Sequence, residues 1–289
     1  AAQSQIVCGV ANVYYTLVLL NQQLDLTRRT SEIWKEQVES MELMKQAARV
    51  NEAAVVQSRA NYYSVLSTIP DLERQIHITQ NTLSLLLNTY PQTWEVTSNL
   101  SFDLPSALTQ GVPMTYLAAR PDVKAAERSL AVTYYAINIS SNGGFTNLLG
   151  SFIANPGKWF IQLAGQLTAP LFSRGQNIAT LQAAKAQQQQ ALNNFEYAVL
   201  NASAEVSDAL VELDKNGQKR EYILQQIDQL EKSVEYTQEL LTLGNPGTTY
   251  LEVLTARSGL LQAQLSSLAC WHARAAALVS LYQAVGGGR

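Results

Sequence analysis

The chain has 289 residues, of which 47% are hydrophobic and 15% charged, and its net charge of −3 argues against a nucleic-acid-binding protein, which usually carries a basic surface patch. Two cysteines exclude a disulfide-dense secreted scaffold, and 15 glycines with 8 prolines exclude a collagen-like or low-complexity chain. The sequence contains no run of about 18 uninterrupted apolar residues, so it predicts no transmembrane helix.

The N-terminal part predicts a long helix. Its apolar positions alternate in steps of three and four residues, which is the spacing of a seam that packs against another helix. These positions are Val13, Leu17, Leu20, Leu24, Trp34, Val38 and Met41. A weak turn is expected at residues 47–51. A second helical pattern follows and continues to Leu86, with a kink or local interruption at Pro70.

The middle of the chain predicts shorter elements. Residues 90–120 are rich in proline, serine and threonine and are predicted to form a linker. Pro121 and Asp122 suit the first turn of a helix that runs to about residue 139. From residue 159 the apolar period becomes two, which predicts one β-strand about as long as a transmembrane strand. The apolar side of this strand, expected to face the membrane, carries Trp159, Ile161, Leu163 and Leu167.

The C-terminal part predicts two more long helices. A helix rich in alanine and glutamine begins near residue 177, and its positions between residues 223 and 241 repeat the apolar seam. Breaker residues at 244–248 predict a turn, and the seam continues from Leu251 to Tyr282. Helices of about 30 to 45 residues would be roughly 45–65 Å long, so we predict an elongated, supercoiled molecule.

The sequence also contains an internal repeat. Residues 55–60 align with residues 253–258, and each copy consists of a long helix, a short turn and a second long helix. We therefore predict a mainly α fold built from two long antiparallel helical hairpins.

Three motifs carry a resemblance to a known family. They are Ala119-Arg120-Pro121-Asp122-Val123, Pro170-Leu171-Phe172 with Gly175, and Gly247-Thr248-Thr249-Tyr250-Leu251-Glu252-Val253-Leu254. In this order they resemble the TolC-like outer-membrane efflux channels. The most similar subgroup is that of the lipoprotein channels paired with resistance–nodulation–division (RND) transporters.

The resemblance implies a homotrimer of the full-length protein. Its hairpins would form the wall of a periplasmic α-barrel, topped by a β-barrel in outer-membrane lipid. A periplasmic adaptor (membrane fusion) protein and an inner-membrane RND transporter would dock at the lower end. The expected location is the outer membrane of a Gram-negative bacterium, with most of the protein projecting into the periplasm and no contact with nucleic acid.

The family pattern contains segments that are not found in this sequence. The first helix, the first strand pair and the lipid-bearing cysteine would precede residue 1, and polar residues 140–144 stand where a further strand is expected. We therefore expect a chain cut down toward its periplasmic part, with a remnant of the barrel. The predicted division is residues 1–118 for the first hairpin and linker, and residues 119–289 for the second repeat, with a shortened barrel segment at about 141–172.

The resemblance places Glu252 at an acidic pore constriction. The position aligned with it in the first repeat is Ala54, with Glu52 nearby, and Thr255 stands where the family often has a second acid. Acidic side chains around a three-fold axis would repel one another and could hold or select cations. Alternatively, Glu252 is a solvated acid in the first turn of a helix, where the helix dipole favours it.

The turns of the two hairpins match the tips that meet the adaptor. The candidate contacts are Val50, Asn51, Gly244, Gly247, Thr248 and Leu251. The alternative for the glycines is ordinary turn chemistry, because glycine supplies permissive backbone angles. Arg59 and Arg257 occupy equivalent repeat positions and either bond across hairpins to hold a closed state or solvate a helix face.

These observations predict a passive exit duct for small molecules, coupled to an inner-membrane pump and opened by an outward, iris-like shift of the hairpins. The alternatives are the exit duct of a type I protein-secretion system and a coiled-coil scaffold that forms no duct. No nucleophile elbow, P-loop or HExxH motif occurs, so we expect no enzyme and no cofactor. His77 and His272 lack ligand spacing to Cys8 or Cys270, so no metal site is expected.

Overall fold

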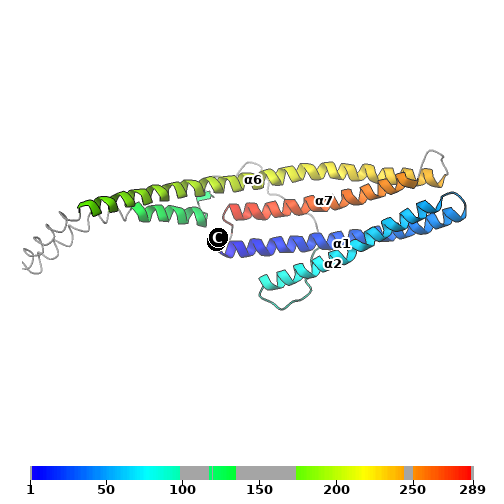
Figure 1. The fold of residues 1–289 in the computed structure, drawn as a ribbon, viewed down its shortest axis with the longest axis horizontal. Helices are drawn as coiled ribbons and strands as arrows, with labels where there is room; N and C mark the ends of the chain where they lie inside the picture. Colours follow the sequence, from blue (N-terminus) through cyan, green and yellow to red (C-terminus); the bar gives the residue numbers. More distant parts are fainter. Residues whose placement is uncertain (1, 98–116, 119, 135–173, 244–249, 288–289) are drawn as a thin grey trace, which may run out of the picture.

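The computed structural model describes residues 2–97, 117–118, 120–134, 174–243 and 250–287. Within these ranges the long helices are α1 (Ala2–Gln46), α2 (Glu52–Leu86), α6 (Arg174–Thr242) and α7 (Tyr250–Ala284). A shorter helix covers residues 121–134 and begins at Pro121, as its sequence predicts. Figure 1 shows the long helices as near-parallel rods in the order α6, α7, α1, α2, which gives an elongated molecule.

The rods form two antiparallel hairpins, which confirms the predicted mainly α fold. The helices α1 and α2 pack together, as do α6 and α7, and α1 lies against α7 to join the two pairs. Contact between α2 and α7 is slight. Since each rod meets its neighbours on its sides, the hairpins form a wall one helix thick, with α6 and α2 at its two edges (Figure 1).

Helix α6 has 69 residues, or about 100 Å at 1.5 Å per residue, so the expectation of 30–45 residues per helix is wrong for it. Its N-terminal part lacks the apolar seam but is rich in alanine and glutamine, which are strong helix formers. With no proline between residues 174 and 242, nothing in the sequence stops the helix.

The first turn lies where the repeat predicts it. After α1 ends, Ala48 takes a left-handed backbone conformation with φ of 57°. The Asn51 side chain then caps α2 by accepting a hydrogen bond from the Ala54 N–H at 3.1 Å. A left-handed residue after a helix is usually glycine, so the alanine here explains why the turn is weak in the sequence.

Helix α2 runs through Pro70 without a break, so the local interruption considered for this position is wrong. Proline has no backbone N–H, so the Leu66 carbonyl lacks its usual partner within the helix. The Pro70 ring lies on an exposed face of α2.

Three apolar clusters hold the described helices together. The junction cluster, at the end farthest from the turns, contains Leu117, Val123, Ala202, Val206, Ala209, Leu281 and Ala284. The upper cluster joins α1 to α2 through Leu17, Leu20, Leu24, Ile76 and Leu83. The tip cluster joins both hairpins near their turns through Trp34, Met41, Val55, Tyr250 and Leu254. The hydrophobic effect over these seams, not helix propensity alone, stabilises such long rods.

Among the described residues, one helix is long and apolar enough to cross a membrane by composition. This is α1, in a window of mean hydropathy 1.2 near the N-terminus, whereas the sequence analysis predicted none. Packed core helices meet the same criterion, and α1 lies between α2 and α7, so this is weak evidence for a membrane span.

Several predicted features lie outside the described residues. They include the strand with Trp159, Ile161, Leu163 and Leu167, the barrel segment at 141–172, the turn at 244–248 and the end of the helix near residue 139. The division into residues 1–118 and 119–289 stays a prediction.

Candidate functional site

The tips of the two hairpins lie at the same end of the molecule. The turn at residues 47–51 stands beside the end of α6 and the start of α7 (Figure 1). Trp34 and Met41 of α1 and Val55 of α2 pack there against Tyr250 and Leu254 of α7. The tips are therefore held together by an apolar contact as well as by polar ones.

One buried hydrogen bond links the hairpins directly. The Ser58 hydroxyl donates to the Ala54 carbonyl at 2.7 Å, and the Ser58 Oγ also contacts the Tyr250 phenol oxygen. Because Ser58 has a single hydroxyl hydrogen, the Tyr250 O–H is the donor in the second bond. Burial raises the pKa of Tyr250, which keeps this donor protonated. The sequence analysis did not identify this pair, since no local pattern connects residues so far apart.

Arg59 and Arg257 lie at equivalent places and bond within their own hairpins. The Arg59 guanidinium donates to Glu42 of α1, with Nη2–Oε1 at 2.5 Å and Nε–Oε1 at 3.2 Å. The Arg257 guanidinium donates to Gln238 of α6. Burial lowers the pKa of Arg257, and Glu36 of α1 partly opposes this from the other hairpin. A role of either arginine in a closed state stays a prediction.

The candidate pore residues have different surroundings. Glu52 pairs with Lys45 across the first turn, and this bond lowers the pKa of its carboxyl. Glu252 is exposed in the first turn of α7, and no ion pair within the described ranges involves it. Thr255 is exposed and donates its hydroxyl to the Leu251 carbonyl at 2.8 Å. Glu252 is therefore the exposed carboxylate candidate that has no ion-pair partner among the described residues.

The candidate tip contacts also differ. Val50 is partly buried against the tip cluster, and Asn51 is occupied as the α2 cap. Leu251 is 66% exposed, although the apolar pattern placed it in the seam. Gly244, Gly247 and Thr248 lie outside the described residues.

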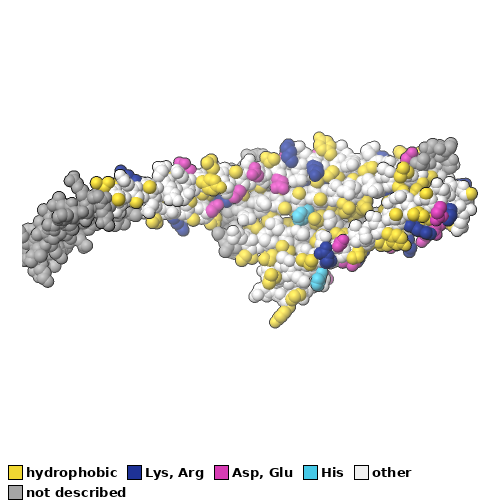
Figure 2. Space-filling view, in the orientation of Figure 1, with side chains coloured by type: hydrophobic (Ala, Val, Ile, Leu, Met, Phe, Trp, Pro, Cys, Tyr) yellow, Lys and Arg dark blue, Asp and Glu magenta, His cyan; other side chains and the backbone are white. Residues whose placement is uncertain are grey.

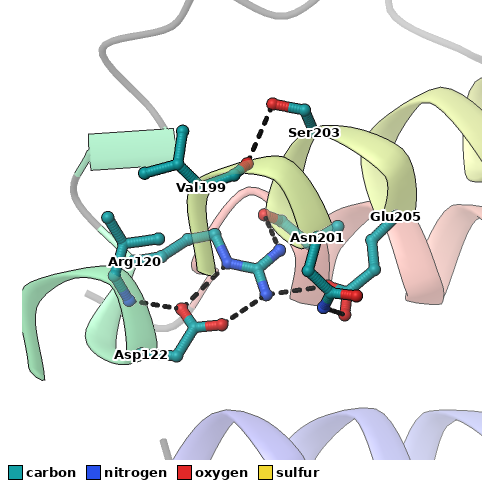
Figure 3. A network of polar contacts seen from close by, with 8 residues as sticks. Arg120, Asp122, Val199, Asn201, Ser203 and Glu205 are labelled. Carbon is teal, nitrogen blue, oxygen red and sulfur yellow. Dashed lines mark hydrogen bonds and ion pairs between the residues drawn. The ribbon is translucent and has the colours of Figure 1, made fainter. Parts of the chain in front are cut away.

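A second polar network lies at the opposite end of the second hairpin. The buried Arg120 guanidinium binds Asp122 (Nη2–Oδ2 2.7 Å), Glu205 of α6 (Nη2–Oε2 2.7 Å) and the Ala284 carbonyl of α7 (3.0 Å). Figure 3 shows this side chain between Asp122 and Glu205. The bond to Arg120 lowers the pKa of Asp122. We call these four residues the arginine clamp, because they tie three helices together above the junction cluster.

The sequence analysis treated Pro121 and Asp122 as helix-opening residues and as part of a family motif, and it assigned no ion pair to Arg120. An Arg-Pro-Asp run does signal a possible arginine–carboxylate pair, but Glu205 is too distant in sequence to be identified from it.

A family model described as "Outer membrane efflux protein" matches residues 112–287, which is more than half of the chain. The chain belongs to the outer membrane efflux protein family. The match includes Arg120, Tyr250, Glu252 and Arg257, while Glu52 and Arg59 precede it.

Members of the outer membrane efflux protein family match almost the whole chain. The cation efflux system protein CusC of Escherichia coli O6:H1 is 30% identical over 98% of this chain. The pyoverdine export outer membrane protein OpmQ of Pseudomonas putida is 28% identical over 97%. The chain spans 64% of the length of the first relative and 61% of the second.

Solved structures show the same fold. A chain from the crystal structures of CusC superposes with a TM-score of 0.82 at 24% identity, over 99% of this chain and 69% of that one. This agreement confirms the resemblance to TolC-like channels at the level of the fold.

Proposed function

We propose that this chain forms part of a passive exit duct of a tripartite efflux system. The duct would stand in the outer membrane of a Gram-negative bacterium and project into the periplasm. The observation that carries this proposal is a wall one helix thick whose two edge helices each present an unpartnered apolar stripe. Figure 2 shows hydrophobic side chains along the length of the face in view.

The stripe on α6 follows one line along the helix. At 100° per residue, six of the nine exposed large apolar residues of α6 fall within an arc of about 60°. They are Tyr197, Leu200, Val211, Tyr222, Tyr236 and Leu240, each at least 37% exposed. Two of the intervals are 11 residues, which is close to three complete turns. A line of this kind suits contact with another helix over most of its length.

The stripe on α2 lies at the other edge of the wall. Val56, Tyr63, Ile78 and Leu85 are between 52% and 79% exposed and fall within an arc of about 60°. The two stripes belong to different helices, so pairing α6 of one copy with α2 of the next is a head-to-tail contact. Such contacts generate rings when the rotation closes, and a ring of this wall encloses a lumen. This supports the homotrimer that the family resemblance implies.

The tips of the two hairpins would move apart when the duct opens. An outward shift of the hairpins has to separate Ser58 from Tyr250 and loosen the tip cluster, so these contacts hold the closed arrangement. Exposed Leu251 and the neighbouring turns would contact a periplasmic adaptor, which in turn would connect the duct to an inner-membrane RND transporter. Exposed Glu252 would line the constriction, with Glu52 and Thr255 nearby in the lumen wall. Transport through the duct itself is passive and needs no catalytic group.

The exported solutes would be small. The curated relatives are named for cation efflux and pyoverdine export, which favours small solutes over the secreted proteins of a type I system. The scaffold alternative makes a different prediction, since a scaffold that forms no duct does not assemble into a ring.

Native mass spectrometry of the full-length protein tests the assembly. We expect a trimer, and we expect Tyr222→Glu with Leu240→Glu to yield monomers, because charges then lie in the apolar stripe. Leu224→Glu is the matched control, since Leu224 is 44% exposed on the opposite side of α6. A wild-type monomer, or a trimer unaffected by the stripe variant, contradicts the proposed wall pairing.

The ion selectivity of the channel tests the role of Glu252. In planar bilayers we expect Glu252→Gln to lower the cation preference of the full-length trimer, because one carboxylate per subunit is lost from the constriction. Unchanged conductance and ion selectivity would remove Glu252 from the pore.

A further inference from the structure

We propose that the first hairpin carries a hinge at Pro70, about which its lower part swings when the tips separate. The inference deepens the proposed function, since it names the element that moves during opening. Three independent observations on α1, α2 and the space between the hairpins coincide at this level.

The first observation is the backbone of α2. Because Pro70 has no N–H, the bond that would span residues 66 to 70 is missing. The ring also crowds the carbonyl four residues earlier, which pushes the two halves of the helix apart on that side. The ring lies on an exposed face, so the bend is directed toward the opposite face of α2.

A cavity of mixed lining lies on that opposite side. It has a volume of about 460 Å³ and opens between α1, α2 and α7. Its polar walls include Asn61, Ser64 and Thr68 of α2 and Gln262 of α7, and apolar side chains such as Trp34 complete the lining. The space gives α2 room to move, and water can solvate its polar groups.

The apolar core of the first hairpin passes from the tip cluster to the upper cluster at the level of Pro70. On α2, Val65 packs against the tip cluster, whereas Ile69 packs against the upper cluster. The missing backbone bond therefore falls on the boundary between two separately packed segments. The upper segment of α2 packs on α1 through the upper cluster, and the lower segment packs on the lower part of α1 and on α7 through the tip cluster.

The third observation is the seam of α1. Between Leu24 of the upper cluster and Trp34 of the tip cluster, the buried positions are Thr27 and Ser31. Their hydroxyls donate to carbonyls of their own helix, Gln23 and Arg28, each at 2.7 Å. Serine and threonine bonded in this way favour helix bending.

The weak point of α1 lies level with Pro70. An ion pair of 2.7 Å joins Arg28 of α1 to Glu73 of α2 and shows the alignment. Both helices of the first hairpin are thus weakened at one level. The second hairpin differs in its lack of proline, because neither α6 nor α7 contains one, and the stretch of α7 matching Pro70 in the repeat is at about 266–268. That stretch shares only the weaker bending element, since the Ser266 hydroxyl donates to the Gln262 carbonyl at 2.8 Å.

At rest, the bond between Ser58 and Tyr250 and the tip cluster hold the lower segment against the second hairpin. Once that bond is released, the lower segment bends about Pro70 while the upper segment stays in place.

Pairs of spin labels on the full chain, with buried Cys8 and Cys270 replaced by alanine, test the hinge. One pair, Gln57 and Glu235, lies below the hinge level, and a second pair, Thr82 and Gln283, lies above it; all four positions are exposed. In Tyr250→Phe we expect a broader distance distribution for the lower pair only. Adding Pro70→Ala should narrow that distribution by roughly half, because the substitution restores a helical hydrogen bond and favours a straight helix.

Ser67→Ala is the matched control, since Ser67 is exposed one turn from Pro70 and keeps the backbone bond pattern. It should leave both distributions unchanged. The hinge is overturned if Pro70→Ala has no effect on the lower pair, or if Tyr250→Phe broadens both pairs equally. Because the distances are measured within one chain, a failed hinge is distinguishable from a failure of ring assembly.

Discussion

The two hairpins share a repeat but differ in how their middles and ends are built. The second hairpin consists of two proline-free helices, and the 12 buried residues of α7 include five alanines, among them Ala263, Ala275 and Ala277. The first hairpin has Pro70, a polar seam and a turn without glycine. The comparison teaches that the repeat determines helix pairing and tip position, whereas stiffness depends on a few residues that the two copies do not share.

The largest expected effect concerns the base of the second hairpin. Arg120→Ala removes the centre of the arginine clamp and leaves two carboxylates and the Ala284 carbonyl without their partner. We expect a loss of about 3 kcal/mol in the free energy of unfolding, as for other broken, partly buried ion pairs. Hydrogen exchange should increase near residue 284 and not in the first hairpin.

Arg128→Ala is the control for this prediction. Arg128 lies on the helix that follows Arg120 and is exposed, so its removal should change the free energy of unfolding by less than about 0.5 kcal/mol. Equal effects of the two substitutions would show that the clamp does not stabilise the hairpin.

A further prediction concerns the turn between α1 and α2, where an alanine has the backbone conformation that usually favours glycine. Ala48→Gly should raise the free energy of unfolding by about 1 kcal/mol, because Ala48 has a left-handed conformation that glycine adopts without steric cost. Ala47→Gly, one residue earlier and without a positive φ, should not stabilise the protein. Urea denaturation measures both, and a destabilised Ala48→Gly would contradict the turn geometry.

Acid should weaken the second hairpin through Asp122. Its pKa is lowered in the folded chain, so it stabilises the fold above its ordinary value of 3.8, and this stability is lost as pH falls toward the lower folded value. We expect Asp122→Asn to reduce the slope of stability against pH in this window. An identical slope in both proteins would show that Asp122 contributes nothing to acid sensitivity.

The smallest effect is expected at the tip of the first hairpin. The ion pair of Arg59 with Glu42 is about half exposed, so Arg59→Ala should leave the free energy of unfolding almost unchanged. A double-mutant cycle with Glu42→Ala measures the coupling energy of the pair. A clearly measurable coupling energy would mean that the pair is more rigid or more desolvated than its exposure indicates.

Local patterns in the sequence were sufficient to predict which helix faces pack together in the hairpins. The seam positions Leu17, Leu20, Leu24 and Met41 are buried as their spacing predicts, because a heptad pattern needs only a neighbouring helix. The same pattern failed at Leu251 and Tyr282, which are 66% and 43% exposed near the ends of α7, where none of the described helices covers them.

The contacts that connect distant segments could not be predicted. Arg120 meets Glu205 and Ala284, and Tyr250 meets Ser58, only because the rods lie side by side in the folded chain. The length of α6 was underestimated because its first half lacks an apolar seam. The turn at residues 47–51 was found only by analogy with the second repeat, since Ala48 gives no breaker signal.

The polar stretch in the seam of α1 also fixes the register of the first hairpin. If α1 slid along α2 by one heptad, Thr27 and Ser31 would enter the apolar surroundings of the upper or the tip cluster. This exchange is unfavourable, so polar residues within a coiled-coil seam select one alignment over its shifted competitors. The same residues that allow the hairpin to flex thereby prevent it from slipping.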